Sequence, residues 1–109
     1  MGTANVLEAA RSVPRDVRDA IKVAARNIRT VAKAQVPKGW RVTVTPGVVV
    51  EQRVRPLDRV GCYVPGGRYP MVASAHMSVV TAKVAGVPRV AACTPPLNGV
   101  PPAATVAAM

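Results

Sequence analysis

The residues best placed to do chemistry lie between Val60 and Gly67, where a short apolar strand runs into a Pro65-Gly66-Gly67 turn. A helical pattern begins directly after this turn. A strand that stops at glycines just before a helix leaves backbone N–H groups unpaired at one end of a sheet. Open α/β sheets bind ligands at that end. Gly66 and Gly67 are therefore candidate contacts for a cofactor, because they let the backbone approach it and free N–H groups for phosphate.

The same two glycines also suit a plain strand-to-helix turn that needs positive φ. The turn does not follow the G-x-G-x-x-G pattern, and no acidic residue stands about 20 positions after it. Cofactor binding and a purely structural turn both remain open at this point. Arg68 follows the glycines and could pair with a phosphate or an anionic substrate, although a solvated surface arginine is the simpler interpretation.

Three further residues could ligate a metal or attack a substrate: Cys62, Cys93 and the single histidine, His76. A catalytic zinc site needs about three converging protein ligands, and these three would converge only by a coincidence of folding. Both cysteines stand among valines and alanines with no histidine at a helpful spacing. We therefore expect buried, reduced, unreactive thiols, and neither a metal ligand nor a catalytic residue in this chain.

The chain is strongly basic, with a formal net charge of +10 over 109 residues. Lys and Arg recur at steps of three and four on one stripe of the first predicted helix: Arg11, Arg15, Arg18, Lys22, Arg26, Arg29 and Lys33. Nucleic-acid binders and proteins of acidic membrane surfaces show such stripes. Aromatic residues for base stacking are scarce, and Asp16 and Asp19 dilute the start of the stripe. We therefore expect a solvated face, or one that meets acidic residues elsewhere, and keep a nucleic-acid-binding module as the alternative from another class.

Residues 1–56 are predicted to form a helical lead-in followed by a β-hairpin. Ser12 and Pro14 indicate the start of the helix, and Pro37-Lys38-Gly39 its end. Apolar residues at helical spacing predict its buried face: Val17, Ile21, Ala24, Ile28 and Val31. Alternating polar and apolar residues on both sides of a Pro-Gly turn predict a hairpin with strands over residues 41–45 and 48–54.

Residues 57–109 are predicted to begin a dinucleotide-binding domain. A strand over residues 59–64, a helix over 71–85 that stops at Gly86, and a strand over 89–93 make one parallel βαβ unit. A further helix starts at Ala103 and runs to Met109 without a cap. Two parallel strands do not complete a sheet. We therefore expect an α/β fragment, in which the N-terminal helix and hairpin lead into the first βαβ of an incomplete, truncated Rossmann-like domain.

With these segments laid out, the chain resembles the amino-terminal part of the histidinol dehydrogenase family. The similarity extends from about residue 12 to residue 109, and its most distinctive part is the run RPLDRVGCYVPGG from Arg55 to Gly67. Further matches are Val13-Pro14, Pro46-Gly47-Val48, the helix end AKVAGV and Thr94-Pro95-Pro96. The segment from Arg68 to Met77 departs from the histidine-pathway pattern. Its G-R-Y-P form is similar to a branch that includes sulfopropanediol dehydrogenases, which leaves the substrate open.

The resemblance implies an NAD- and zinc-dependent alcohol dehydrogenase that oxidises histidinol in histidine biosynthesis or, as the alternative, another polar alcohol such as 2,3-dihydroxypropane-1-sulfonate. It implies that Tyr63, with Gly66 and Gly67, lies against the dinucleotide. The family's zinc ligands and acid/base residues lie downstream of the matched region, so we expect this chain alone to be inactive. A homodimer and a cytoplasmic location are also implied. No apolar run reaches about 18 residues, so we expect no membrane span.

Overall fold

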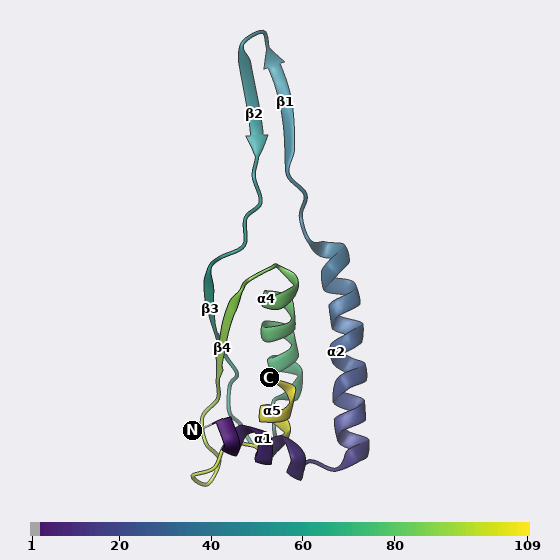
Figure 1. Ribbon diagram of the computed structural model, residues 1–109, viewed down its shortest axis with the longest axis vertical. Coiled ribbons are helices and arrows are strands. Elements are labelled where there is room, and N and C mark those ends of the chain that lie inside the picture. The colour runs from purple at the N-terminus through teal and green to yellow at the C-terminus, as the bar shows by residue number, and fades with distance from the viewer. Residues whose placement is uncertain (1–2) are drawn as a thin grey trace.

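The computed structural model describes residues 3–109 and is drawn in Figure 1. The chain contains both helices and strands, as the α/β prediction requires. In chain order the elements are α1 (Thr3–Ser12), α2 (Arg15–Gln35), β1 (Trp40–Thr45), β2 (Val48–Gln52), β3 (Arg59–Tyr63), α3 (Val72–Ala75), η1 (His76–Val80), α4 (Thr81–Val84), β4 (Arg89–Cys93) and α5 (Ala103–Ala108).

The lead-in contains two helices where the sequence predicted one. Ser12 was expected to open the helix, but it is the last residue of α1, and its hydroxyl donates to the carbonyl of Ala9 at 2.7 Å. Pro14 occupies the N-cap of α2, where its fixed φ suits the entry and its missing N–H costs nothing. The prediction was therefore right about Pro14 and wrong about Ser12, because a serine can also bond backward at the end of a helix.

The buried face of α2 is rotated from the predicted one. Ile21 and Ala32 are buried, whereas Val17 and Val31 are 38% and 59% exposed. Arg18 is half-buried beside Ile21, where both line a small hollow that Ala107 of α5 also borders. An arginine stem can cover apolar surface while its charged head stays in water. The spacing alone therefore could not choose between two neighbouring faces of this helix.

The hairpin β1–β2 is confirmed, and every residue of both strands is exposed. The strands pair antiparallel from Trp40 opposite Gln52 to Thr45 opposite Val48, with a register shift between Thr43 and Thr45. Gly47 has a φ of +83°, which fits the third position of a type II turn after proline. Figure 1 shows this hairpin projecting away from the helices. Its residues therefore add little to the core.

The second half forms the predicted βαβ unit. β3 and β4 pair parallel in direct register, from Arg59 opposite Arg89 to Tyr63 opposite Cys93. The connecting helix runs from Val72 to Val84, and its middle, η1, is π-helical. Gly86 has a φ of +86°, as expected for a residue that ends a helix. The two-stranded sheet is α/β in character, but with two strands it does not by itself establish a Rossmann-like domain.

The small core joins residues from both halves of the chain. Ile21 of α2 clusters with Val64, which follows β3, with Ala75 of α3 and with Ala108 of α5. α1 packs on α5, and α2 packs on η1, α4 and α5. The predicted boundary near residue 56 therefore separates two sequence patterns whose helices share one core, and the division into domains stays a prediction.

The molecule is elongated, with extents of 64 × 25 × 25 Å and a radius of gyration of 18.3 Å. A compact chain of this length would have a radius of gyration of about 13 Å. The projecting hairpin accounts for the difference. Of the helices within residues 3–109, not one combines the length and the apolar character that crossing a bilayer demands.

Candidate functional site

The carboxyl ends of β3 and β4 lie side by side and form the edge at which the sequence predicted a ligand. Tyr63 is in register with Cys93, and the N–H of Val64 donates to the carbonyl of Cys93 at 2.8 Å. Cys62 and Val64 are buried on the helix-covered face of the sheet. Tyr63 lies between them in sequence and is 65% exposed, because successive strand residues point to opposite faces. Its ring is therefore available to a ligand.

The two glycines after β3 differ in what surrounds them. Neither has a positive φ, so the alternative interpretation of a turn that needs positive φ does not hold for this pair. A Cβ built on Gly66 would stand 2.5 Å from Cγ of Pro95, whereas one built on Gly67 would meet nothing within 4 Å. Gly66 is required because the loops after β3 and β4 touch. Gly67 leaves open space at the edge, as close approach of a cofactor to the backbone would require.

Thr94 is a polar residue at this edge that the sequence indicated only as part of the Thr94-Pro95-Pro96 motif. It follows β4 directly, and its buried Oγ1 has no hydrogen-bond partner within residues 3–109. Thr94 and Cys93 both line a hollow of about 570 Å³ beside α5. Its position in the sequence could have identified Thr94 as a site residue, because the first polar residue after a parallel strand lies at the ligand-binding edge.

Arg68 and Tyr69 lie in the connection between β3 and α3. Both are exposed, and Arg68 forms no ion pair within the described part of the chain. Its guanidinium is free to meet either water or an anion. Both predicted interpretations of Arg68, a solvated arginine and a contact to an anion, agree with this exposure.

The residues that could have ligated zinc do not gather. Within residues 3–109 no group of three His, Cys, Asp or Glu side chains could hold a metal ion. His76 is 1% exposed inside η1, its Nε2 has no hydrogen-bond partner among the described residues, and burial lowers the pKa of its imidazole. Cys62 is buried as predicted, but Cys93 is exposed, because the face of the sheet opposite the helices is uncovered. The expectation that both thiols are buried is therefore wrong for Cys93.

A larger hollow of about 890 Å³ lies between the end of α2, the segment before β3, β3 itself and α4. Tyr63 borders it, and Arg55 is the charged residue of its lining. Most of the remaining lining is aliphatic, from residues such as Val36, Val54, Leu57, Val60 and Val84. The lining contains no carboxylate and no histidine. The hollow could therefore hold an apolar group beside the ring of Tyr63, but it contains neither a carboxylate nor an imidazole to act as acid or base.

This arrangement suits binding rather than bond-making. An exposed tyrosine, an open glycine backbone and a buried hydroxyl without a partner in residues 3–109 share one edge of a parallel sheet, where a planar cofactor with phosphates could bind. The described residues supply neither a metal centre nor an acid/base pair.

Comparisons with known proteins agree with the family resemblance. The sequence profile described as histidinol dehydrogenase matches residues 1–109. A histidinol dehydrogenase homolog from Shouchella clausii is 54% identical over 101 residues, which are 91% of this chain and 24% of that protein. Sulfopropanediol 3-dehydrogenase from Ruegeria pomeroyi is 45% identical over 94 residues, 84% of this chain and 22% of that protein.

The fold agrees with a solved structure as well. The crystal structure of histidinol dehydrogenase from Elizabethkingia anophelis superposes with a TM-score of 0.87 at 28% identity, covering 99% of this chain and 25% of that chain. The present chain thus spans about a quarter of the length of the relatives it matches.

Proposed function

Because the chain belongs to the histidinol dehydrogenase family, we propose that it forms one wall of the dinucleotide site in an NAD- and zinc-dependent alcohol dehydrogenase. The observation that carries this proposal is the edge formed by Tyr63, Gly67 and Thr94 at the carboxyl ends of two parallel strands. Ligands of open α/β sheets bind at such edges. The sheet would then be the start of a larger Rossmann-like domain.

The described residues fit a bound NAD in three ways. The exposed ring of Tyr63 offers a flat surface for a base or a nicotinamide. The open space at Gly67 lets a phosphate approach backbone N–H groups, and the buried Oγ1 of Thr94 lacks a hydrogen-bond partner within residues 3–109. NAD would supply the hydride acceptor. The role of this chain would be to position the cofactor and to exclude water from one side of it.

The described residues do not fit a zinc ion, because no three potential ligands converge. The zinc of the complete enzyme and its acid/base residues would therefore be held by other parts of the protein, and this chain alone would not turn over substrate. Assembly as a homodimer and a cytoplasmic location belong to the same proposal.

The substrate we favour is histidinol, because the family profile matches the whole chain. A sulfonated diol is the second candidate. Arg68 is exposed and without an ion pair in the described chain, directly after the proposed cofactor edge. A guanidinium at that position suits an anionic alcohol, and one similar protein is a sulfopropanediol 3-dehydrogenase.

The test compares two exposed tyrosines in the complete enzyme. Tyr63→Ala should raise KM for NAD about tenfold, since stacking of a base on an aromatic ring contributes about 1–3 kcal/mol. Tyr69→Ala, which removes a similarly exposed ring that lies beyond the end of β3, should leave that KM unchanged. Steady-state kinetics with histidinol and with 2,3-dihydroxypropane-1-sulfonate would also decide the substrate. Equal KM values for NAD in Tyr63→Ala and the parent enzyme would remove Tyr63 from the site.

A further inference from the structure

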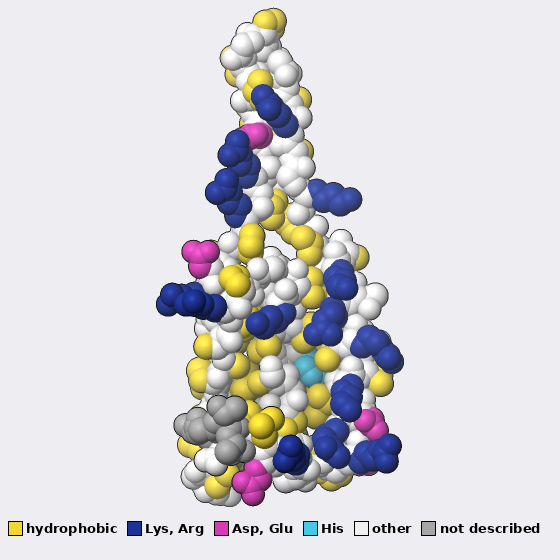
Figure 2. All heavy atoms as spheres, in the orientation of Figure 1, with side chains coloured by type: hydrophobic (Ala, Val, Ile, Leu, Met, Phe, Trp, Pro, Cys, Tyr) yellow, Lys and Arg dark blue, Asp and Glu magenta, His cyan; other side chains and the backbone are white. Residues whose placement is uncertain are grey.

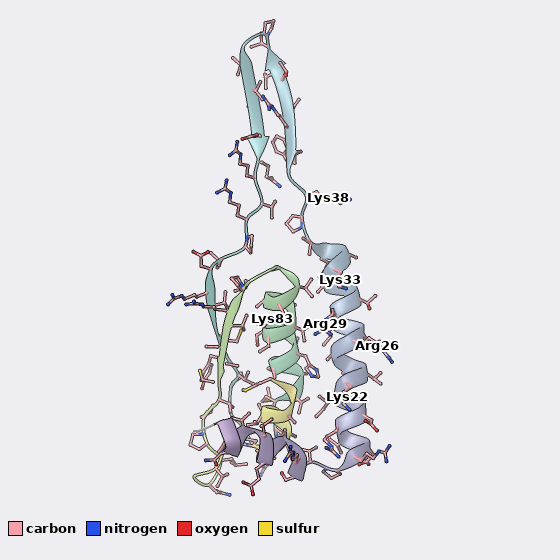
Figure 3. All side chains as sticks on the ribbon, in the orientation of Figure 1. Lys22, Arg26, Arg29, Lys33, Lys38 and Lys83 are labelled. Atoms are coloured by element: carbon pink, nitrogen blue, oxygen red, sulfur yellow. The ribbon has the colours of Figure 1, made fainter. Side chains whose placement is uncertain are left out.

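The strongest unassigned feature is a surface of lysines and arginines on one side of the molecule. Figure 3 shows its members: four on α2, one on the segment after α2 and one on α4, and we call them the basic face: Lys22, Arg26, Arg29, Lys33, Lys38 and Lys83. All six are exposed. On α2 they follow one another at steps of three and four residues, about 4.5–6 Å apart along the helix axis. They thus form a row rather than a scatter.

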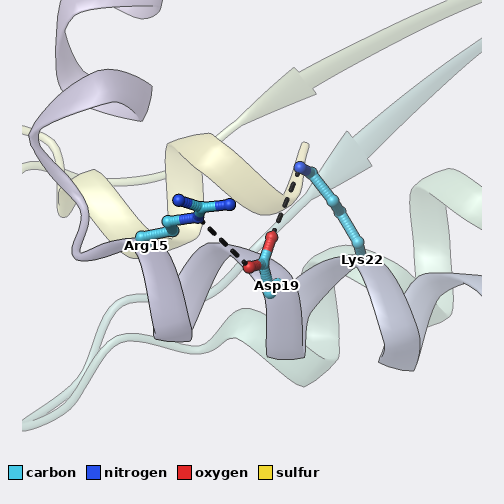
Figure 4. Close-up of polar contacts among 3 residues, drawn as sticks. All are labelled: Arg15, Asp19 and Lys22. Atoms are coloured by element: carbon cyan, nitrogen blue, oxygen red, sulfur yellow. Dashed lines mark ion pairs between the residues drawn. The ribbon is translucent and has the colours of Figure 1, made fainter.

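The basic face has almost no acidic counterpart. The sequence contains no Asp or Glu between residues 20 and 50, and none after Asp58. Within residues 3–109 the one ion pair of the basic face joins Lys22 to Asp19 at 3.5 Å, and Figure 4 shows Asp19 shared with Arg15. Figure 2 shows the same imbalance, with Lys and Arg side chains along the whole of α2 and an acidic one only near its lower end. The other residues of the basic face therefore form no ion pair within the described residues, and their positive charges repel one another.

The helix itself does not account for these charges. Cations are stabilised at the C-terminal end of a helix by the helix dipole, which explains Lys33 in the last turn of α2. This stabilisation falls off within one turn, so it does not explain Lys22 and Arg26. Like charges four residues apart repel each other, as Lys22 and Arg26 do, and so do Arg29 and Lys33. A partner that brings negative charge would remove this repulsion.

The geometry points to an acidic polypeptide as that partner, and we propose that the basic face docks onto a carboxylate-rich protein surface. α2 is packed along one side against η1, α4 and α5, so only its opposite side, which carries the basic row, can meet a partner, and a carboxylate-rich surface complements that charge. The three aromatic residues of the chain, Trp40, Tyr63 and Tyr69, lie outside α2 and outside the helix from Val72 to Val84. Base stacking on this face is therefore absent, which disfavours single-stranded nucleic acid.

The test uses the 109-residue chain and fluorescently labelled poly-L-glutamate, followed by anisotropy at increasing salt. Two variants each remove four positive charges, so their net charges are equal. The basic-face variant carries Lys22→Gln, Arg26→Gln, Arg29→Gln and Lys33→Gln. The matched control changes four other exposed arginines: Arg41→Gln, Arg55→Gln, Arg59→Gln and Arg89→Gln. Glutamine is a good helix former, and circular dichroism would verify folding of both variants.

The proposal expects the basic-face variant to bind poly-L-glutamate at least about tenfold more weakly than the parent chain, and the control to lose less than about threefold. Equal losses in the two variants would overturn it, because binding would then follow net charge alone. Absence of binding by the parent chain would overturn it as well. Tighter binding of a duplex oligonucleotide than of poly-L-glutamate, with the same dependence on the basic face, would assign the surface to nucleic acid instead.

Discussion

Gly66 stands so close to Pro95 that a methyl group on its Cα would lie 2.5 Å from the proline Cγ. The loop after β3 and the loop after β4 therefore lie close together at the proposed cofactor edge. Gly67, one residue further, has open space around the same position. The two neighbouring glycines therefore serve different purposes.

Gly66→Ala should lower the free energy of unfolding by about 1–3 kcal/mol, because the new methyl group overpacks against a rigid ring. Gly67→Ala should raise it by about 0.4–1 kcal/mol, since alanine restricts the unfolded chain and meets no clash. Urea unfolding of the two variants measures both effects. The double variant Gly66→Ala/Pro95→Ala should recover part of the loss, and a full loss in the double variant would place the strain elsewhere.

The buried histidine should make stability depend on pH. Burial lowers the pKa of His76 in the folded chain below its ordinary value of 6.5, so below that pH the unfolded chain binds the proton more readily. The free energy of unfolding should therefore be constant above about pH 7 and decrease as the pH falls below about 6.5. Urea midpoints across this range measure the effect.

His76→Leu provides the control for this pH dependence. His76 is the only histidine, so the variant should show a flat profile between about pH 5.5 and 7.5. It should also be more stable, because it removes a buried nitrogen that has no partner within the described residues. A decrease of the same size in the variant would assign the titration to another group.

The exposed hairpin should unfold independently of the core. Gly47 and Gly86 have nearly equal positive φ values, +83° and +86°, and alanine at either position should cost about 1–2 kcal/mol. Gly47→Ala should speed amide hydrogen exchange within residues 40–52 and leave the global urea midpoint unchanged. Gly86→Ala should lower the global midpoint, because Gly86 ends the helix that covers the sheet. A lowered midpoint in Gly47→Ala would mean that the hairpin packs on the body of the molecule.

Thr94 and Thr105 test the cofactor edge in another way. Both have a buried Oγ1 without a partner within residues 3–109. Replacing either by valine should raise the free energy of unfolding by about 1 kcal/mol, because an unsatisfied hydroxyl is removed with little change of shape. In the complete enzyme, Thr94→Val should also raise KM for NAD, whereas Thr105→Val should not. The same KM for all three proteins would exclude Thr94 from the site.

The sequence predicted best those elements that strong local signals define. Alternation around Pro46-Gly47 located the hairpin, and Gly86 located the end of a helix at a residue that indeed has positive φ. β4 was predicted over residues 89–93, which are its observed bounds. The π-helical turn of η1 carries no such signal, so the sequence indicated only a continuous helix there.

Features that depend on tertiary contacts were harder to predict. The observed buried face of α2 differs from the predicted one, because the stem of Arg18 packs as an apolar group. The sequence did not predict α1, because Ser12 was interpreted as the N-cap of a helix rather than the end of one. The exposure of Cys93 could not be predicted from its apolar neighbours, because it depends on whether anything covers that face of the sheet. At the candidate site, Tyr63 and Gly67 remain supported proposals, while the steric role of Gly66 was visible only once Pro95 could be placed beside it.

The length of the β1–β2 arm affects how the mass of this protein should be measured. A chain with a radius of gyration of 18.3 Å experiences more friction than a sphere of 11.4 kDa. It will elute early from a size-exclusion column, where a monomer can be mistaken for a dimer. Light scattering or sedimentation equilibrium, which do not depend on shape, are the methods that would count its subunits correctly.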